Sequence, residues 1–340
     1  MHRRNARTRT LCLLAILLAS GSAHCQPESR RLPYIPPKLH NWPQPYRGVP
    51  GLEAHVFVTG FVELPEALLV RGGAWTRMRQ LPVTSLVLQH PQQGVLVVDS
   101  GLSKAVAAEK VWPGSFLFPA EGLVQLEAAA DLSEALPRAG IRPEAVRWIV
   151  QTNLRALRTG NLRAFPRATV VATTAERDYA SRQQTGYDPA LWAGVEQWRS
   201  VDFTAAQPLG TFERAVDLLG DGSVQLIDGR GPTPGTMIVL VRLPRRALLW
   251  ASDVVPTWGT LRTAREPYGL WNGDAWWLTF WRVKRLADLA PEVQIVPAFD
   301  STGSGEPSFP ARFHELPTPA TSPTRRPSPN PWERILPRPW

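Results

Sequence analysis

Hydrophobic residues in the middle of the chain recur at two spacings, which predict an alternation of strands and helices. Short apolar or alternating runs of about four to eight residues are typical of strands. A turn signal at Pro91-Gln92-Gln93-Gly94 joins two of these runs and predicts a hairpin. The predicted strands cover residues 55–58, 83–89, 95–99, 146–151, 169–172, 223–227, 236–242, 247–250 and 294–297.

Longer segments with apolar positions three and four residues apart predict helices over 123–139, 175–182 and 275–290. In the last of these, a stripe that begins with Trp276 and Phe280 has the spacing of a core face. Trp277 and Trp281 fall on another face of the same helix. Exposed tryptophans often mark an interface or a ligand wall, so this pair is a candidate interaction surface. The alternative is that the N-terminal lead or the C-terminal tail covers them.

Strands followed by helices, twice along the chain, predict an α/β sandwich with two similar halves. The segments on either side have a different composition. Residues 26–50 are rich in proline and predict an extended lead, and residues 316–340 combine proline with serine, threonine and arginine. Such a tail buries too little apolar surface to offset its ordering entropy, so we predict that it is disordered. The predicted organisation is a leader at 1–23, a lead at 24–52, a folded domain at 53–315 and a tail at 316–340.

The first residues have the pattern of a secretory signal. Four arginines precede the apolar run 11–19, and small residues follow, with the simplest cleavage point after Ala23. The run is shorter than the roughly 20 residues that a membrane-spanning helix needs, and no later stretch qualifies. We therefore expect an exported protein, in the periplasm or outside the cell. Cys25 is a candidate for lipid attachment, but His24 stands where a small residue is expected, and the alternative is an unpaired thiol.

Composition and charge exclude some classes of protein. Hydrophobic residues make up 44% of the 340 residues and charged residues 20%, which is enough for a sizeable core. The formal net charge is +9, but the leader and the tail carry most of it. The folded body is therefore close to neutral, and we expect no nucleic-acid partner.

Four segments carry a family resemblance. They are V-L-V-V-D-S-G-L at 95–102, T-N-L-R-A-L-R-T-G at 152–160, A-L-L-W-A-S-D at 247–253 and I-V-P-A-F-D at 295–300. In this order and at these spacings, the set resembles the metallo-β-lactamase-fold hydrolases, and their lactonase-like branch most. The resemblance implies a four-layer αββα sandwich and, in the family, a catalytic pair of metal ions.

The residues at the family's metal-binding positions do not match this chemistry. Only the bridging aspartate is retained, as Asp253. The other positions map onto Asn153, Arg155, Leu157, Arg158, Pro232 and Phe299. A zinc site needs three or four N, S or O ligands, and an arginine is always protonated and has no lone pair to donate. The sequence therefore predicts no metal, no other cofactor and no catalytic residue at this site.

The arginines allow more than one role for the altered site. A guanidinium can replace a metal's positive charge and pair with a carboxylate, so Arg155 or Arg158 would bridge Asp253. Alternatively, Arg155, Arg158 and Arg230 would bind an anionic ligand such as a carboxylate. A third arrangement points both arginines of the motif to solvent. Asp99 is interpreted as structural, because an aspartate at a strand end commonly caps the next turn.

Three functions remain open from the sequence. The leading hypothesis is a non-catalytic, exported protein on this fold that binds a small anion or a protein partner. The second is an active metal-dependent lactone or ester hydrolase with a metal site that the motif does not reveal. The third is an envelope scaffold that acts through Trp277, Trp281 and the proline-rich tail. The identity of the partner is not determined, and a homodimer is compatible with the resemblance.

Overall fold

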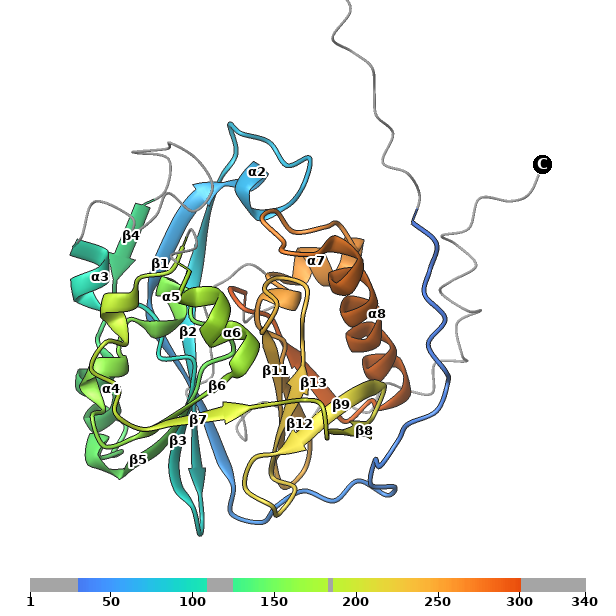
Figure 1. Cartoon of the computed structure of the whole chain (residues 1–340), viewed down its shortest axis with the longest axis horizontal. Coiled ribbons are helices and arrows are strands. Elements are labelled where there is room, and N and C mark those ends of the chain that lie inside the picture. The colour runs from blue at the N-terminus through green and yellow to red at the C-terminus, as the bar shows by residue number, and fades with distance from the viewer. Residues whose placement is uncertain (1–29, 109–124, 183–185, 301–340) are drawn as a thin grey trace, which may run out of the picture. The chain divides into compact units, whose positions relative to one another are not determined.

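The computed structural model describes residues 30–108, 125–182 and 186–300 (Figure 1). The predicted leader with Ala23, Cys25 and the tail at 316–340 lie outside these residues. Contacts divide the chain into a short unit, Met1–Tyr34, and a main unit, Ile35–Trp340. Among the described residues, no helix combines the length and the apolar composition needed to cross a membrane.

The main unit contains two β-sheets. The first has seven strands in the order β4-β1-β2-β3-β5-β6-β7, and the second has six in the order β13-β12-β11-β10-β9-β8. The first sheet consists of β1 (Glu53–Pro65), β2 (Met78–His90), β3 (Gly94–Val98), β4 (Gln125–Ala128), β5 (Val146–Val150), β6 (Thr169–Thr173) and β7 (Trp198–Val201). The second consists of β8 (Gln207–Leu209), β9 (Phe212–Asp217), β10 (Val224–Asp228), β11 (Met237–Arg242), β12 (Ala247–Trp250) and β13 (Val293–Val296).

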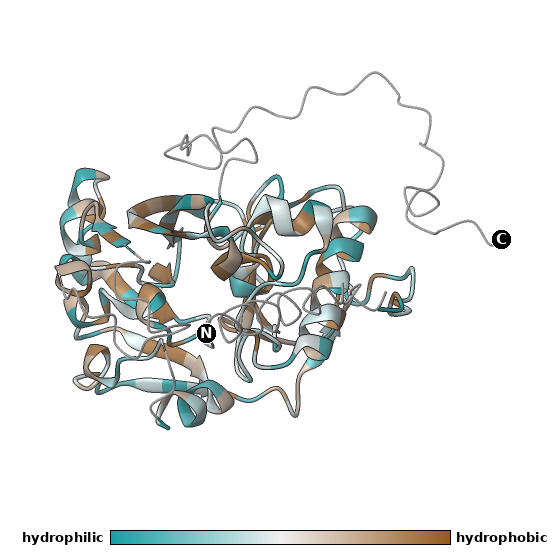
Figure 2. Cartoon of the chain, turned by 90° about the horizontal axis from the view of Figure 1, so that it is seen from above, coloured by the Kyte–Doolittle hydropathy of each residue, from teal (hydrophilic) through white to brown (hydrophobic). Residues whose placement is uncertain are grey.

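Helices lie on the outer side of each sheet (Figure 1). On the first sheet's side are α3 (Lys104–Ala108), α4 (Leu132–Arg138), α5 (Ala156–Thr159) and α6 (Thr174–Ala180), and on the second sheet's side are α7 (Trp258–Thr263) and α8 (Gly273–Leu289). The remaining helical segments are α2 (Glu66–Leu69), η1 (Pro143–Ala145), η2 (Leu162–Ala164), η3 (Pro189–Leu191) and η4 (Ser252–Val254). Hydrophobic and hydrophilic residues mix along the helices, as expected of helices with one buried face (Figure 2).

The core lies between the two sheets and follows the period of two that strands impose. In β12, Leu248 and Trp250 point into the cluster between the sheets, whereas Ala247 and Leu249 point to the layer that contains α8. On α8, Trp276 and Phe280 are fully buried in that outer layer, as the predicted core stripe requires. The prediction of a four-layer αββα sandwich is therefore confirmed.

One predicted helix is partly wrong. The segment predicted as a helix over 123–139 contains the strand β4 and then the short helix α4. Strand β4 pairs antiparallel with β1, with Leu126 opposite Val62 and Glu127 opposite Phe61. The unpaired edge of β1 offers hydrogen bonds that local helix propensity does not outweigh. Spacing along the chain contains no information about that edge.

Residues 35–50 of the lead belong to the main unit and lack regular structure along most of their length. Trp42 is only 8% exposed, and its indole Nε1 donates to Glu292 Oε1 at 2.7 Å. The backbone N–H of Val49 donates to the carbonyl of Arg242 at 2.9 Å. Residues 35–50 therefore form part of the folded body although they lack a periodic apolar pattern.

His90, the last residue of β2, connects turns from both sheets. Its Nδ1 accepts the backbone N–H groups of Gln92 and Gln93, each at 3.2 Å. Since Nδ1 is an acceptor here, Nε2 carries the proton and donates to Asp221 Oδ2 at 2.8 Å. The hairpin turn after β2 is thus held to the turn between β9 and β10.

We expect Asp221→Asn to reduce the sensitivity of the fold to acid. Burial raises the pKa of Asp221, but hydrogen bonds from Ser223 and the neighbouring His90 outweigh it, and the pKa is lowered overall. A lowered pKa adds stability above the unfolded value of about 3.9, and this stability is lost as pH falls through the folded value. The gap between the urea midpoints of the wild type and the variant should be widest near neutral pH and shrink in acid. A gap that stays constant as pH falls would contradict this account.

Candidate functional site

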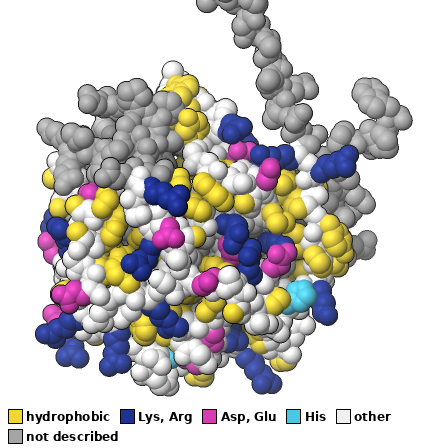
Figure 3. All heavy atoms as spheres, in the orientation of Figure 1, with side chains coloured by type: hydrophobic (Ala, Val, Ile, Leu, Met, Phe, Trp, Pro, Cys, Tyr) yellow, Lys and Arg dark blue, Asp and Glu magenta, His cyan; other side chains and the backbone are white. Residues whose placement is uncertain are grey.

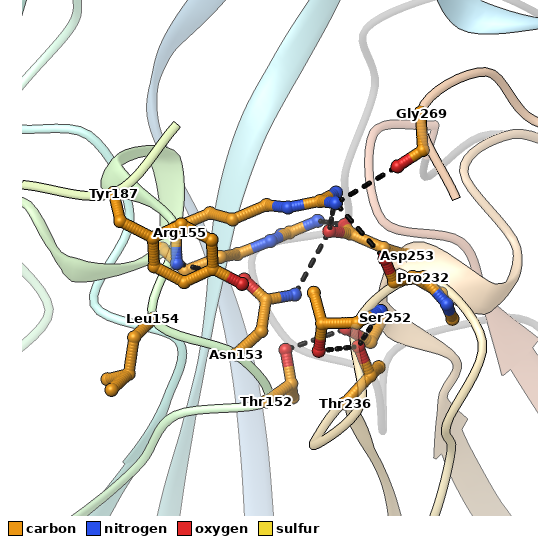
Figure 4. A network of polar contacts seen from close by, with 12 residues as sticks. Thr152, Asn153, Leu154, Arg155, Tyr187, Pro232, Thr236, Ser252, Asp253 and Gly269 are labelled. Carbon is orange, nitrogen blue, oxygen red and sulfur yellow. Dashed lines mark hydrogen bonds and ion pairs between the residues drawn. The ribbon is translucent and has the colours of Figure 1, made fainter. Parts of the chain in front are cut away.

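Four of the predicted site residues meet where strands of both sheets end. Asn153 and Arg155 follow β5 and lead into α5, and Arg158 lies within α5. Asp253 lies in η4, directly after β12. Because the ends of β5 and β12 lie at the same side of the sandwich, residues about one hundred positions apart converge there (Figure 4).

Both carboxylate oxygens of Asp253 are bound by side-chain N–H groups. Arg158 Nη2 donates to Oδ1 at 2.6 Å, and Arg155 Nη1 donates to Oδ2 at 3.1 Å. Asn153 Nδ2 also donates to Oδ2, at 3.0 Å (Figure 4). Burial raises the pKa of Asp253, but the two guanidinium groups outweigh it and lower the pKa overall. Asp253 is therefore an ionised acceptor whose charge is balanced by arginine.

Arg158 is the most buried cation of this network, with only 1% of its side chain exposed. Its guanidinium carbon lies 4.5 Å from the ring centre of Phe299, in a cation–π contact. Its Nη1 lies 3.7 Å from Asp99 Oδ2. Leu157 packs with Phe299 in an apolar cluster beside it. Of these two predicted site residues, Phe299 directly contacts the arginine.

Arg155 closes the network on the other side. Its Nη2 donates to the carbonyls of Pro232 at 3.2 Å and Gly269 at 3.4 Å (Figure 4). Burial lowers the pKa of Arg155, but Asp253 and then the Tyr187 and Glu176 groups raise it overall. The carbonyl of Pro232 thus joins Asn153, Arg155, Arg158 and Asp253 in one polar network.

Asp99 is buried beside this network and serves as an internal hydrogen-bond acceptor. Its Oδ1 accepts the backbone N–H of Thr152 at 2.8 Å, and its Oδ2 accepts the indole N–H of Trp250 at 2.9 Å. The Thr152 hydroxyl also donates to it. Burial raises the pKa of Asp99, against the opposing charge of Arg158. Asp99 therefore joins distant segments, through Thr152 and Trp250, and does not cap the next turn as the sequence suggested.

Glu176 is a third buried carboxylate, and the sequence reasoning missed it. It accepts the backbone N–H of Leu154 at 2.9 Å, the Tyr187 hydroxyl at 2.8 Å and the Thr233 hydroxyl. Burial raises its pKa. The sequence contains one signal for Glu176: a threonine, Thr173, three residues earlier, which is a pattern typical of a helix start. In the structure, Thr173 Oγ1 accepts the backbone N–H of Glu176.

The network leaves no excess positive charge for a ligand. Two guanidinium groups face three carboxylates, those of Asp99, Glu176 and Asp253, within the part of the chain that the structure describes. A buried cation needs such partners, because an unpaired one would be costly. Of the arrangements considered from the sequence, the geometry matches the one in which the arginines bridge Asp253.

Arg230 does not join the other two arginines. It forms an ion pair with Asp228, with Nη2 2.7 Å from Oδ2, and its side chain is 42% exposed. Asp228 ends β10, and Arg230 follows two residues later, so the pair forms locally. The grouping of Arg230 with Arg155 and Arg158 in one anion site is not what the structure shows.

Trp281 does not form an exposed surface, so the predicted interface is wrong at this residue. Its side chain is 7% exposed and contacts Phe280 and Trp277. Lys284, one turn further along α8, lies over Trp281 and donates to the carbonyl of Leu261 at 2.9 Å. Leu261 of helix α7 packs in the same cluster, and so do Ile35 and Leu39 of the lead, which the sequence suggested as one possible cover. Trp277 is half-buried in the same cluster.

The donor set does not fit a metal ion. Among the described residues, no group of three or more His, Cys, Asp or Glu side chains is placed to hold one. Around Asp253 the nearest groups are protonated guanidiniums and an amide N–H, which repel a cation or offer it no lone pair. His55 and His90 lie elsewhere, in β1 and β2.

Two sandwiched sheets flanked by helices, with a polar site at the ends of β5 and β12, define a metallo-β-lactamase-fold protein. Comparison with solved structures agrees. Bacillus thuringiensis AiiA with N-decanoyl-L-homoserine bound superimposes with a TM-score of 0.62 at 16% identity, over 73% of this chain and 93% of that chain. AidC, a dizinc quorum-quenching lactonase, gives a TM-score of 0.55 at 13% identity, over 78% and 92%.

Curated sequences similar to this chain are also lactonases. The N-acyl homoserine lactonase AttM of Rhizobium radiobacter is 31% identical over 186 residues, which are 52% of this chain and 66% of that protein. AttM of Azorhizobium caulinodans is 29% identical over 173 residues, 49% of this chain and 62% of that protein. The chain thus spans slightly less than two thirds of these relatives, and no protein-family model matches it. The chain therefore has the fold of these lactonases and is similar in sequence to part of the AttM proteins.

Proposed function

We propose that this chain is a non-catalytic member of its superfamily, in which an arginine–aspartate network replaces the metal centre. The observation that carries the proposal is the saturation of Asp253 by Arg155, Arg158 and Asn153. A hydrolase of this fold needs a cation to lower the pKa of a bound water and polarise a carbonyl. Here two fixed guanidinium charges occupy that position, and neither can carry a water as a metal does. The role of the chain is then to bind a small anion or a protein partner.

A second function, metal-dependent lactone hydrolysis, is favoured by the relatives. The AttM proteins are named as N-acyl homoserine lactonases, and AidC is named as a dizinc lactonase. An active site of that kind would need ligands from residues outside the described ranges, since the described ones supply no suitable group. The comparisons therefore support the second function, lactone hydrolysis. The donor chemistry around Asp253 supports the first function, in which hydrolytic activity is lost.

Metal analysis separates the two functions. We expect the purified chain, after exposure to zinc and desalting, to retain much less than one equivalent of zinc. We also expect no hydrolysis of N-acyl homoserine lactones above background, with or without a chelator. An AttM lactonase assayed in parallel serves as the positive control. Stoichiometric zinc together with chelator-sensitive turnover would establish the second function and refute the first.

Export belongs to the same proposal. It is supported by the basic and apolar leader that ends near Ala23, with the periplasm or the exterior as the destination. Attachment of a lipid at Cys25 is the alternative for a protein that stays at the membrane surface. The scaffold function loses one of its two surfaces, because Trp281 is covered by α7.

A further inference from the structure

A pocket separate from Asp253 lies beside the loop that follows β10. Its volume is about 110 Å³, and segments from both sheets form its walls. The start of α6, the loop after β7, strand β9 and the loop 228–236 all contribute. None of the four residues that meet at Asp253 lines it. Two of its lining residues are arginines, Arg214 and Arg230.

One buried carboxylate holds both arginines in place. Asp228, with 9% of its side chain exposed, lies 3.0 Å from Arg214 Nε and 2.7 Å from Arg230 Nη2 through its Oδ2. Its Oδ1 accepts Arg230 Nε at 3.0 Å. The two guanidinium groups are therefore oriented before any ligand arrives, which reduces the entropy lost on binding.

The arginines have donors left over. A guanidinium carries five N–H groups. Arg230 Nε donates to Asp228 Oδ1, whereas Arg214 Nε and Arg230 Nη2 lie within ion-pair distance of Asp228 Oδ2. Among the described residues, neither Nη group of Arg214 nor Nη1 of Arg230 donates to a protein acceptor. The side chains are 39% and 42% exposed, so these donors are accessible. Arg155 and Arg158 differ, because both are largely buried and each donates to Asp253.

The charge of the pocket limits which ligands fit. Asp202 also lines it and accepts the backbone N–H of Thr204 at 2.9 Å, so two arginines face two aspartates. Both basic and acidic side chains appear on the face shown in Figure 3, without a broad area of one sign. Attraction must therefore come from directed hydrogen bonds, which suit the planar or tetrahedral oxygens of a carboxylate or phosphate.

We propose that Arg214 and Arg230 form a binding site for a small oxyanion, a carboxylate or a phosphate group, with Asp228 as the positioning residue. The volume of about 110 Å³ is several times the roughly 10–15 Å³ that one water molecule needs, so the pocket has room for a group of this size. The exposed hydroxyls of Thr174 and Thr204 lie at the rim and can donate as well. The site does not depend on the proposed function, since it would exist equally in an active hydrolase.

Titration of the full chain with inorganic phosphate and with acetate, at ionic strength matched by sodium chloride, tests the proposal. We expect saturable binding of at least one of them, with a dissociation constant on the order of 1 mM. Arg214→Gln and Arg230→Gln should each weaken it by about tenfold or more. Both residues are partly exposed, so circular dichroism should show an unchanged fold. Binding of phosphate alone or of acetate alone supports the site and identifies the chemical class.

Arg245→Gln is the matched control. Arg245 is an exposed arginine in the turn between β11 and β12, outside the pocket. The Arg245→Gln variant should bind the anions like the wild type. Non-specific electrostatic attraction would weaken with the loss of any positive charge, whereas a directed site loses affinity only when one of its own arginines is removed. Equal binding by Arg214→Gln and the wild type, an equal loss in Arg245→Gln, or no saturable binding of either anion would each overturn the proposal.

Discussion

Replacing Arg158 with methionine should lower the free energy of unfolding by about 3–5 kcal/mol, the cost of breaking a buried ion pair by removing one partner. Arg158 is 1% exposed and lies 2.6 Å from Asp253 Oδ1 and 3.7 Å from Asp99 Oδ2. Methionine fills similar space beside Phe299 but leaves both carboxylates without this cation. Urea denaturation at neutral pH measures the loss.

A double-mutant cycle separates the ion pair from lost packing. Asp253→Asn removes the partner's charge, so the combined variant Arg158→Met with Asp253→Asn should be less destabilised than the sum of the single variants. A coupling free energy of about 0.5–3 kcal/mol is typical of residues in one network. Arg245→Met, at an exposed position, should change stability by no more than about 0.5 kcal/mol. Strictly additive single effects would show that Asp253 and Arg158 do not stabilise each other.

Trp250→Ala should also cost about 3–5 kcal/mol, the usual range for deleting a large aromatic side chain from a core. Trp250 is fully buried between the two sheets, and its Nε1 donates to Asp99. The alanine leaves a cavity in the central layer and removes one of the hydrogen bonds that satisfy a buried carboxylate. Urea midpoints, with the slope checked for two-state behaviour, measure the change.

Trp250→Phe distinguishes these two contributions. Phenylalanine retains most of the ring volume but has no N–H, so the expected loss is smaller, about 1–3 kcal/mol for one lost hydrogen bond to a buried carboxylate. If the phenylalanine and alanine variants were equally unstable, the hydrogen bond to Asp99 would dominate and the packing argument would be wrong. If phenylalanine were neutral, Asp99 would not need the indole.

Buried strands and the long helix were predictable because their patterns are local. Strands β2, β5, β10, β11 and β12 are apolar runs with turn signals at their ends, and α8 shows a core stripe of helical period. Short elements such as β7 and β8 were missed, since runs of three or four residues show no reliable period. Strand β4 was predicted as part of a helix, because its strand state depends on the edge of β1.

The candidate site was predictable in part. From the order of the motif segments we predicted that Asn153, Arg155, Arg158 and Asp253 belong to one site, and the structure brings these four residues into contact. Glu176 was missed because its position three residues after Thr173 is already explained by the start of helix α6, so the pattern indicates no further role. Its second role, accepting hydrogen bonds from Tyr187 and Thr233, involves residues that no sequence period connects to it.

By itself, the sequence determined the αββα class and the order of the motif segments, because both depend on residue type and local order. Only the tertiary structure decided which charges meet. In the structure, Arg155 and Arg158 form ion pairs with Asp253, and Arg230 forms one with Asp228. Helix α7 lies over Trp281. The physical reason is that an ion pair or a covered face is a property of two segments, and the distance between them is set by packing across the whole sandwich.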